Sequence, residues 1–210
     1  MTQGLHPEHE VVLGVGHSRQ ELGPVAAEQL HVRVPAPGAR LLGQLQVAVT
    51  EAPDAGAFLE EPWRELVACA RGLNPKQIAD EYTQLFGGVG KPEVYLFGSH
   101  YLSGFLNEKP LVKLRNDLAD LGLARSQDMS ETEDHAAYVF EVMRYLIAGD
   151  DVAVSNLTHQ MAFFNQHVQP WVSLMCQALM AHPRAVFYAR VANFTTAFMS
   201  VEAQGFDLLS

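Results

Sequence analysis

From residue 39 to the C-terminus, apolar residues recur every three or four positions, the spacing that places them on one face of an α-helix. The clearest run steps from Leu111 to Leu121, and Gly122 follows it as an expected helix end. Similar runs cover 41–49, 66–73, 78–86, 136–147, 157–168, 171–179 and 187–201. Pro170 should end one helix and lie in the first turn of the next. No part of the sequence shows the sustained two-residue alternation of strands, so we predict an all-α bundle of about eight to ten helices.

The first 37 residues differ from the rest because glycine and proline interrupt them repeatedly. We therefore predict a loosely structured N-terminal extension over residues 1–38, with one short helix around Arg19 to Leu30. Residues 39–210 would form the all-helical domain. A chain of 210 residues can bury roughly 70% of its unfolded surface, so this domain needs no disulfide or metal for stability.

The chain carries 14 basic and 24 acidic residues, a formal net charge of −10. Such a surface repels nucleic acid and anionic lipid and attracts a basic peptide. Cys69 and Cys176 have no partner at metal-binding or disulfide spacing, which favours a reducing, cytoplasmic setting. The sequence contains neither a run of about 18 apolar residues nor a secretory signal over Met1 to Glu10, so we expect no membrane insertion and no export.

Enzyme signatures are missing from the sequence. It contains no Walker A sequence, no Gly-x-Ser-x-Gly elbow and no HExxH pair, and Gly14-Val15-Gly16 lacks the third glycine of a dinucleotide fingerprint. An acid–base pair of Asp134 and His135 is disfavoured because adjacent residues of a helix do not face each other. We therefore predict no catalytic residues, no metal site and no enzymatic activity.

Two aromatic segments are candidates for a docking surface. Glu81 to Gly88 is an aromatic helix end followed by a glycine hinge, and Tyr95 to Leu102 is an aromatic run interrupted by Gly and Ser. Aromatic side chains on a loop beside a helix end bury a large area while few rotamers are frozen. The alternative is that these rings pack the core beneath a loop.

A third segment, Ser130 to His135, is acidic. Ser130 and Glu133 have the spacing of a capping box, so a helix should begin here, with His135 held neutral by the positive end of its dipole. Glu141 lies seven residues after Asp134, on the same expected stripe. Between residues 117 and 151 there are nine acidic and two basic residues, so this region should attract a basic peptide. The alternative is a helix cap with solvated carboxylates.

These three segments, in this order, resemble motifs of the TorD/DmsD family of redox-enzyme maturation chaperones. The similar motifs are Glu81-Tyr82-x-x-Leu85-Phe86, Phe97-Gly98-Ser99-His100-Tyr101, Glu131-Thr132-Glu133-Asp134-His135 with Phe140-Glu141-Val142-Met143, and Phe163-Phe164-x-x-His167-x-x-Pro170-Trp171. The resemblance covers roughly residues 39–207 and implies a TorD-like bundle with a hinge near residues 126–134. Thr132 stands where the family has a hinge proline, and the first 37 residues match nothing in the family.

The resemblance implies a cytoplasmic chaperone, a monomer or dimer, without a cofactor of its own. Its client would be an apo molybdenum oxidoreductase, bound through the twin-arginine signal peptide until molybdopterin guanine dinucleotide is inserted. The NarJ branch, which binds the mature subunit, is the alternative. Some family members bind guanine nucleotide weakly, and the absence of a phosphate loop here leaves that point open.

The peptide-binding hypothesis assigns each half of a signal peptide a partner. Its apolar stretch would lie in a groove lined by Tyr82, Leu85, Phe86, Phe97 and Tyr101. Its arginines would meet carboxylates near Asp134, on the stripe that includes Glu141. His135 and Ser99 would fix polar groups of the peptide.

Overall fold

The computed structural model describes residues 10–15, 28–33, 39–48, 57–87, 90–125 and 130–209. Its helices are α1 (Ala39–Gln46), α2 (Ala57–Arg71), α3 (Pro75–Phe86), α4 (Gly98–Ser103), α5 (Lys109–Asp120), α6 (Ala136–Ala148), α7 (Leu157–Phe163), the π-helical turn η1 (Phe164–Val168), α8 (Gln169–Ala181) and α9 (Phe187–Asp207). Its strands are β1 (Glu10–Val15), β2 (Glu28–Arg33) and β3 (Leu123–Arg125).

The predicted all-α fold class is confirmed, and most helix ends lie where the sequence placed them. At the start of α3, the Asn74 side chain accepts the Gln77 N–H while the Gln77 side chain accepts the Asn74 N–H, a complete capping box followed by Pro75. Gly149 ends α6 by donating its N–H to the Tyr145 carbonyl. Short polar and glycine signals of this kind are local, which is why they can be recognised in a sequence.

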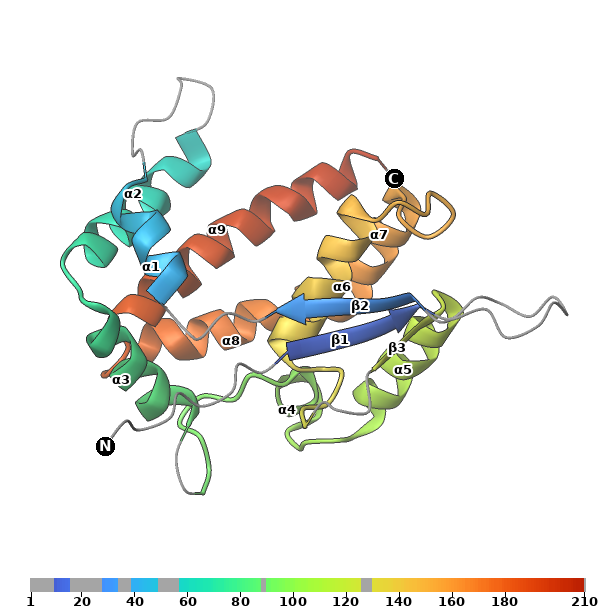
Figure 1. The fold of residues 1–210 in the computed structure, drawn as a ribbon, viewed down its shortest axis with the longest axis horizontal. Helices are drawn as coiled ribbons and strands as arrows, with labels where there is room; N and C mark the ends of the chain where they lie inside the picture. Colours follow the sequence, from blue (N-terminus) through green and yellow to red (C-terminus); the bar gives the residue numbers. More distant parts are fainter. Residues whose placement is uncertain are drawn as a thin grey trace, which may run out of the picture.

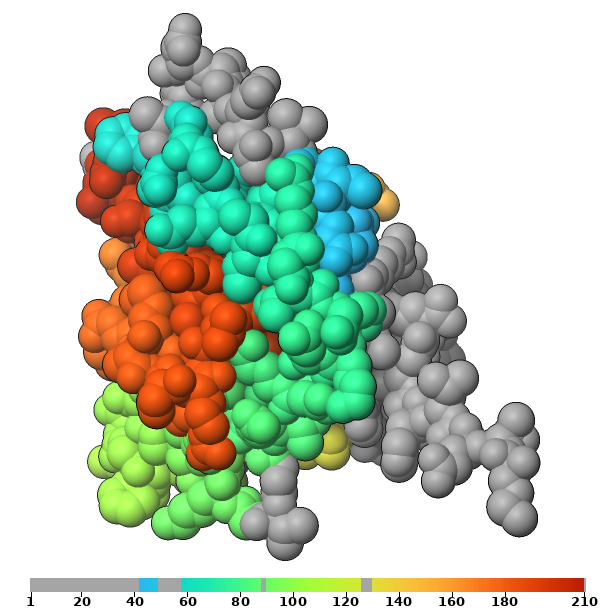
Figure 2. All heavy atoms as spheres, turned by 90° about the vertical axis from the view of Figure 1, so that its left-hand side faces the viewer, coloured from blue at the N-terminus to red at the C-terminus, as the bar shows by residue number. Residues whose placement is uncertain are grey.

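Helix α9 connects the two halves of the bundle (Figure 1). At its N-terminal half it packs against α1, α2 and α3, and along its length it packs against α8. Figure 2 shows α2 and α3 (teal to green) beside α8 and α9 (orange to red) on one face of the molecule. One core cluster lies among α1, α2, α3 and the start of α9, and a larger one lies among α5, α6, α7, η1 and α8.

The prediction that strands are absent is wrong for the N-terminal region. β1 pairs antiparallel with β2 and with β3, giving the strand order β2-β1-β3. Residues 28–30 of the expected short helix lie in β2, whereas residues 19–27 lie outside the described part of the chain. Leu30 and Val32 alternate with polar residues, but the run is too short to stand out from the surrounding glycines and prolines. The boundary between extension and helical domain stays a prediction.

A single carboxylate joins α3 to α9. Glu81, 9% exposed, accepts the backbone N–H groups of Val186 (2.8 Å) and Tyr188 (2.9 Å) on Oε1 and of Phe187 (3.0 Å) on Oε2. Helix α9 receives no hydrogen bond from the side chain of its own N-cap residue, Val186. The carboxylate of another helix therefore satisfies the free N–H groups at this helix start and lies at the positive end of its dipole.

We expect Glu81→Gln to lower the free energy of unfolding by about 2–4 kcal/mol, because an amide keeps one acceptor oxygen and loses the negative charge in a buried site. The measurement is equilibrium urea unfolding. Asp80→Asn is the matched control, since Asp80 is exposed and, within the described part of the chain, pairs with Lys76; it should change stability by less than about 0.5 kcal/mol. Equal stabilities of the two variants would contradict this role of Glu81.

Candidate functional site

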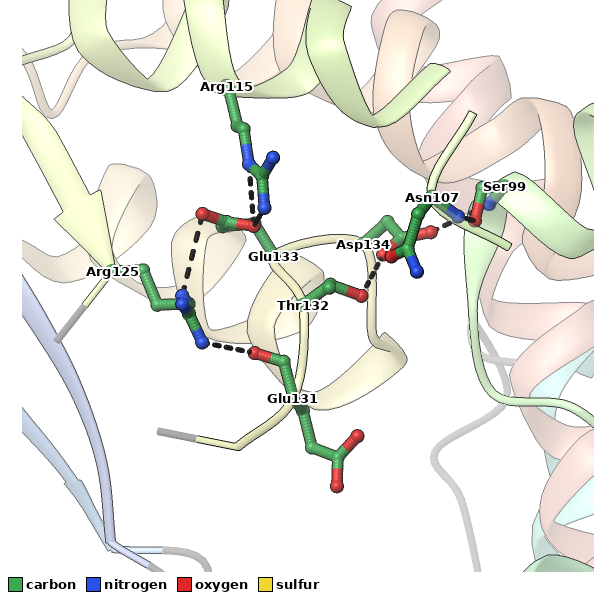
Figure 3. Close-up of polar contacts among 8 residues, drawn as sticks. All are labelled: Ser99, Asn107, Arg115, Arg125, Glu131, Thr132, Glu133 and Asp134. Carbon is green, nitrogen blue, oxygen red and sulfur yellow. Dashed lines mark hydrogen bonds and ion pairs between the residues drawn. The ribbon is translucent and has the colours of Figure 1, made fainter. Parts of the chain in front are cut away.

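The second and third motifs meet at a junction between the start of α4 and the turn before α6, which we call the α4–α6 junction (residues 96–99 and 132–136). The Gly98 N–H donates to the Asp134 carbonyl (2.9 Å), and the Ala136 N–H donates to the Leu96 carbonyl (2.8 Å). The Asp134 carboxylate accepts the Ser99 N–H on Oδ2 (2.8 Å) and the Thr132 hydroxyl on Oδ1 (2.6 Å). Two segments 35 residues apart in the chain are thus fixed side by side (Figure 3).

A second acidic side chain of this turn is held by two arginines. Glu133 Oε2 lies 2.8 Å from a guanidinium nitrogen of Arg115 on α5, and its Oε1 lies 3.6 Å from Arg125 on β3. Arg125 also donates to the Glu131 carbonyl at 3.0 Å (Figure 3). The carboxylate is 10% exposed. The turn is therefore anchored from both sides, by α5 and by the sheet.

The helix after this turn begins later than the sequence predicted. We expected Ser130 and Glu133 to form a capping box, but α6 begins at Ala136, and its N-cap residue is His135. His135 Nδ1 accepts the Ala137 N–H at 3.2 Å. Glu133 cannot serve as the N3 partner because its carboxylate is bound to arginines from other elements. Asp134 likewise precedes the helix, so it does not share a helical stripe with Glu141.

Burial favours the neutral form of His135, in addition to the predicted effect of the helix start. Burial lowers the pKa of His135, and the nearby carboxylates of Glu131 and Asp134 oppose that shift without reversing it. The ring lies edge-on to Phe97, with centroids 5.0 Å apart. An unprotonated Nδ1 is required for the helix cap, so the neutral ring and the helix start depend on each other.

The aromatic residues of the first motif form one cluster with α9. Tyr82 and Phe86 pack together with ring centroids 5.1 Å apart, and both contact Tyr188 of α9, at 6.0 and 5.1 Å. All three rings are partly exposed, whereas Leu85 is completely buried in the larger core. Sequence reasoning missed Tyr188, because nothing near residue 188 connects it with α3.

The aromatic residues of the second motif are fixed by the core. The Tyr101 hydroxyl donates to the Tyr95 carbonyl (2.8 Å), its ring stacks on Trp171 at 6.1 Å, and burial raises the pKa of Tyr101 to about 12. Gly98 also faces this indole: a Cβ at Gly98 would lie 3.0 Å from ring atoms of Trp171. The α4 backbone can approach Trp171 only because residue 98 is a glycine.

The predicted site residues are thus partly brought together and partly sequestered. The Leu85 carbonyl accepts the N–H groups of Glu93 and Val94 (both 3.0 Å), which places the end of α3 beside the segment leading to α4. Tyr82, Phe86, Phe97, Tyr101 and His135 are partly exposed. Leu85 and Ser99 are fully buried, and Asp134 is 4% exposed with its carboxylate engaged internally. A direct contact of these three with a peptide requires the junction to open, and peptide binding by the set stays a prediction.

The acidic region is less charged than its local sequence suggests. Lys113 and His167 contact Asp117, Arg115 and Arg125 contact Glu133, and Arg144 forms a bidentate pair with Glu141 (2.5–2.9 Å). Lys113, Arg115 and His167 come from outside residues 117–151, so a count within that window misses them. Asp128 lies outside the described residues. Asp120, Glu131 and Asp150 are exposed acids of the region.

Among the described residues, no helix is long and apolar enough to cross a membrane. The same part of the chain contains no group of three or more His, Cys, Asp or Glu side chains placed to hold a metal ion.

The class of structure is an all-α helical bundle in which the start of α4, with its aromatic residues, meets a buried acidic turn before α6. A family model described as the nitrate reductase delta subunit matches residues 53–177, more than half of the chain. The chain belongs to this family, and the resemblance to the TorD/DmsD family of maturation chaperones is confirmed.

Curated proteins similar to this chain are named Chaperone protein TorD, a chaperone rather than an enzyme, in agreement with the prediction of no enzymatic activity. The protein of Aliivibrio fischeri is 24% identical over 136 residues, which are 61% of this chain and 63% of the relative. That of Photobacterium profundum is 25% identical over 135 residues, 60% of this chain and 62% of the relative. That of Vibrio cholerae is 24% identical over 140 residues, 63% of this chain and 64% of the relative. The match therefore spans somewhat less than two thirds of these relatives.

We expect Asp134→Asn to lower the free energy of unfolding by about 1–3 kcal/mol, because the amide weakens two buried hydrogen bonds across the junction. Urea unfolding measures the loss. Asp150→Asn removes the same charge from an exposed side chain of the same region and should leave stability within about 0.5 kcal/mol of the unmodified protein. If Asp134→Asn were as stable as Asp150→Asn, the junction would not depend on this carboxylate.

Acidification should destabilise the protein through His135. Because the pKa of folded His135 is below its ordinary value, the unfolded chain binds more protons below about pH 6.5, and stability falls as the pH decreases through that range. His135→Asn should flatten this dependence, since Asn caps a helix equally well and does not titrate. His167, whose pKa burial also lowers, leaves a residual slope. Midpoints of urea unfolding, measured between pH 7.5 and 5.5, test this. An equal dependence of the midpoint on pH in the unmodified protein and in His135→Asn would refute it.

Proposed function

We propose that this protein is a maturation chaperone that binds the apoprotein of a molybdenum oxidoreductase, through its twin-arginine signal peptide, before cofactor insertion and export from the cytoplasm. The observation that carries the proposal is the family membership, together with the meeting of the shared motifs at one junction. Binding of the mature subunit, as in the NarJ branch, is the second candidate, because the matched residues do not separate the two modes.

The Tyr82–Phe86–Tyr188 cluster is the proposed contact for the apolar stretch of the peptide. Its rings are partly exposed and pack at tilted or edge-on angles, so they offer a rigid apolar surface that loses little side-chain entropy on binding. Phe97 and His135, which are partly exposed and pack edge-on against each other, belong to the same proposed set.

The charged contact beside this cluster is better assigned to Glu131 than to Asp134. Burial raises the pKa of Tyr82, and the charge of Glu131 adds to that shift, so this exposed carboxylate lies close enough to the cluster to act on it. Asp134 is engaged by Ser99 and Thr132. Exposed arginine–carboxylate pairs contribute about 0–1 kcal/mol each, so the apolar contact should dominate the affinity.

We expect Phe86→Ala to weaken binding of a synthetic twin-arginine signal peptide about ten-fold or more, because it removes the ring that contacts both Tyr82 and Tyr188. Calorimetric titration gives the dissociation constant, and circular dichroism shows that the variant is folded. Phe58→Ala is the matched control: this ring is 81% exposed near the start of α2, at the end far from α3, and its loss should leave binding unchanged. Equal binding by the two variants would place the peptide elsewhere.

The signal-peptide and mature-subunit modes are separated by titrating full-length and leader-deleted apoprotein of a molybdenum oxidoreductase encoded beside this gene. Binding that is lost with the leader supports the proposal. Binding that survives leader deletion unchanged supports the mature-subunit mode instead. If neither form binds, the chaperone function proposed for this client is wrong.

A further inference from the structure

A cavity of about 220 Å³ lies away from the α4–α6 junction, between the C-terminal end of α5 and the α7–η1 segment. Apolar side chains and polar or charged side chains line it together. The lining residues are Asp117, Asp120, Leu121, His159, Ala162, Phe163, Gln166 and His167. None of these residues belongs to the predicted peptide-binding set.

The charges around this cavity favour a cation. Asp117 and Asp120 lie in the last turn of α5, which contains no basic residue, and the negative end of the helix dipole adds to their charge. The Lys113 ammonium lies 2.8 Å from Asp117 Oδ2 and compensates the charge of that carboxylate, and His167 Nε2 lies 2.6 Å from the same oxygen. The exposed Asp120 carboxylate has no ion pair or hydrogen bond to any described residue, so its charge is left uncompensated at the cavity.

A second acceptor comes from His159. Its Nδ1 lies 2.9 Å from the Val154 carbonyl and 3.2 Å from the side-chain nitrogen of Asn156. That nitrogen also donates to the Val152 and Ala153 carbonyls, whereas the Val154 carbonyl can only accept, so the shorter contact places the proton on Nδ1. The Nε2 of the neutral ring is then an acceptor. His159 and Asp120 thus offer hydrogen-bond acceptors beside the apolar side chains of Leu121 and Ala162.

We propose that this cavity binds the guanidinium group of an arginine side chain, with the apolar stem against Leu121 and Ala162. A guanidinium carries only donors, forms two-pronged hydrogen bonds with carboxylates, and is less strongly hydrated than an ammonium, so it suits a partly apolar cavity with a free carboxylate. The volume is below the roughly 300–1,000 Å³ of pockets for larger ligands, which fits one side chain. The source of the arginine is a segment of the client apoprotein, a step that rests on the proposed function.

The binding itself is tested without any client. N-acetyl-arginine methylamide is titrated into the protein while the imidazole NMR signals of His159 and His167 are followed. We expect saturable shifts at millimolar concentration, and an affinity about five-fold lower in Asp120→Asn, as for the loss of one partly exposed ion pair. Asp150→Asn controls for net charge, and the citrulline analogue, which has the same shape without the charge, should cause no saturable shift. Equal responses to the arginine and citrulline compounds, or in Asp120→Asn and Asp150→Asn, would overturn the proposal.

The source of the arginine is tested with the client apoprotein, full-length and leader-deleted. Binding that Asp120→Asn weakens only for the full-length form assigns the arginine to the leader, and weakening of both forms assigns it to the mature chain. If the apoprotein binds the unmodified protein and the Asp120→Asn variant equally, the client is not the source of the arginine and that step is refuted. If arginine methylamide binds but neither apoprotein does, the cavity assignment stands and the proposed function fails.

Discussion

The hydrogen bonds from the start of α9 to Glu81 connect the two halves of this bundle. Tyr188, whose N–H donates to the Glu81 carboxylate, packs against both core clusters, so its position affects each of them. Helix α9 has no side-chain cap of its own, and its approach to α3 depends on the acceptor that α3 supplies. The same contact builds the Tyr82–Phe86–Tyr188 cluster. The proposed peptide surface therefore depends in part on how the helix start is capped, because among the described residues Glu81 makes the hydrogen bonds from α3 to that end of α9.

The α4–α6 junction explains how the chain accommodates threonine in place of the hinge proline. A proline would fix the backbone dihedral φ of residue 132, and it has neither an N–H nor a side-chain donor. Thr132 instead donates its hydroxyl to Asp134, whose other oxygen accepts the Ser99 N–H. The turn is thus fixed by side-chain hydrogen bonds rather than by ring geometry. A junction held in this way can open when those bonds break, and such opening would expose Ser99 and Asp134.

Features set by neighbouring residues could be predicted from the sequence, and features set by distant partners could not. The cap of α3 at Asn74 and the end of α6 at Gly149 depend on residues within one turn. The predicted helix end before Gly122 is a local feature of the same kind, and α5 ends at Asp120. The capping box at Ser130 was wrong because Glu133 binds Arg115 and Arg125, which arrive from α5 and β3. The strands were missed because each is short and is defined by its pairing, β1 with β2 and also with β3, which lies more than 100 residues away, rather than by a pattern of its own. The candidate site was predicted as a set of residues, but which of them are exposed depends on packing.

One irregular turn relates the α4–α6 junction to the cavity. Pro170 has no N–H to donate, and the helix before it widens into the π-helical turn η1, where the Gln169 N–H bonds to the Phe164 carbonyl five residues back. The Trp171 indole N–H then donates to the His167 carbonyl at 2.6 Å. This bond directs the indole toward Gly98 and Tyr101, while the His167 ring reaches Asp117 at the cavity. The Trp171–His167 hydrogen bond thus joins the packing of α4 to a residue that lines the cavity.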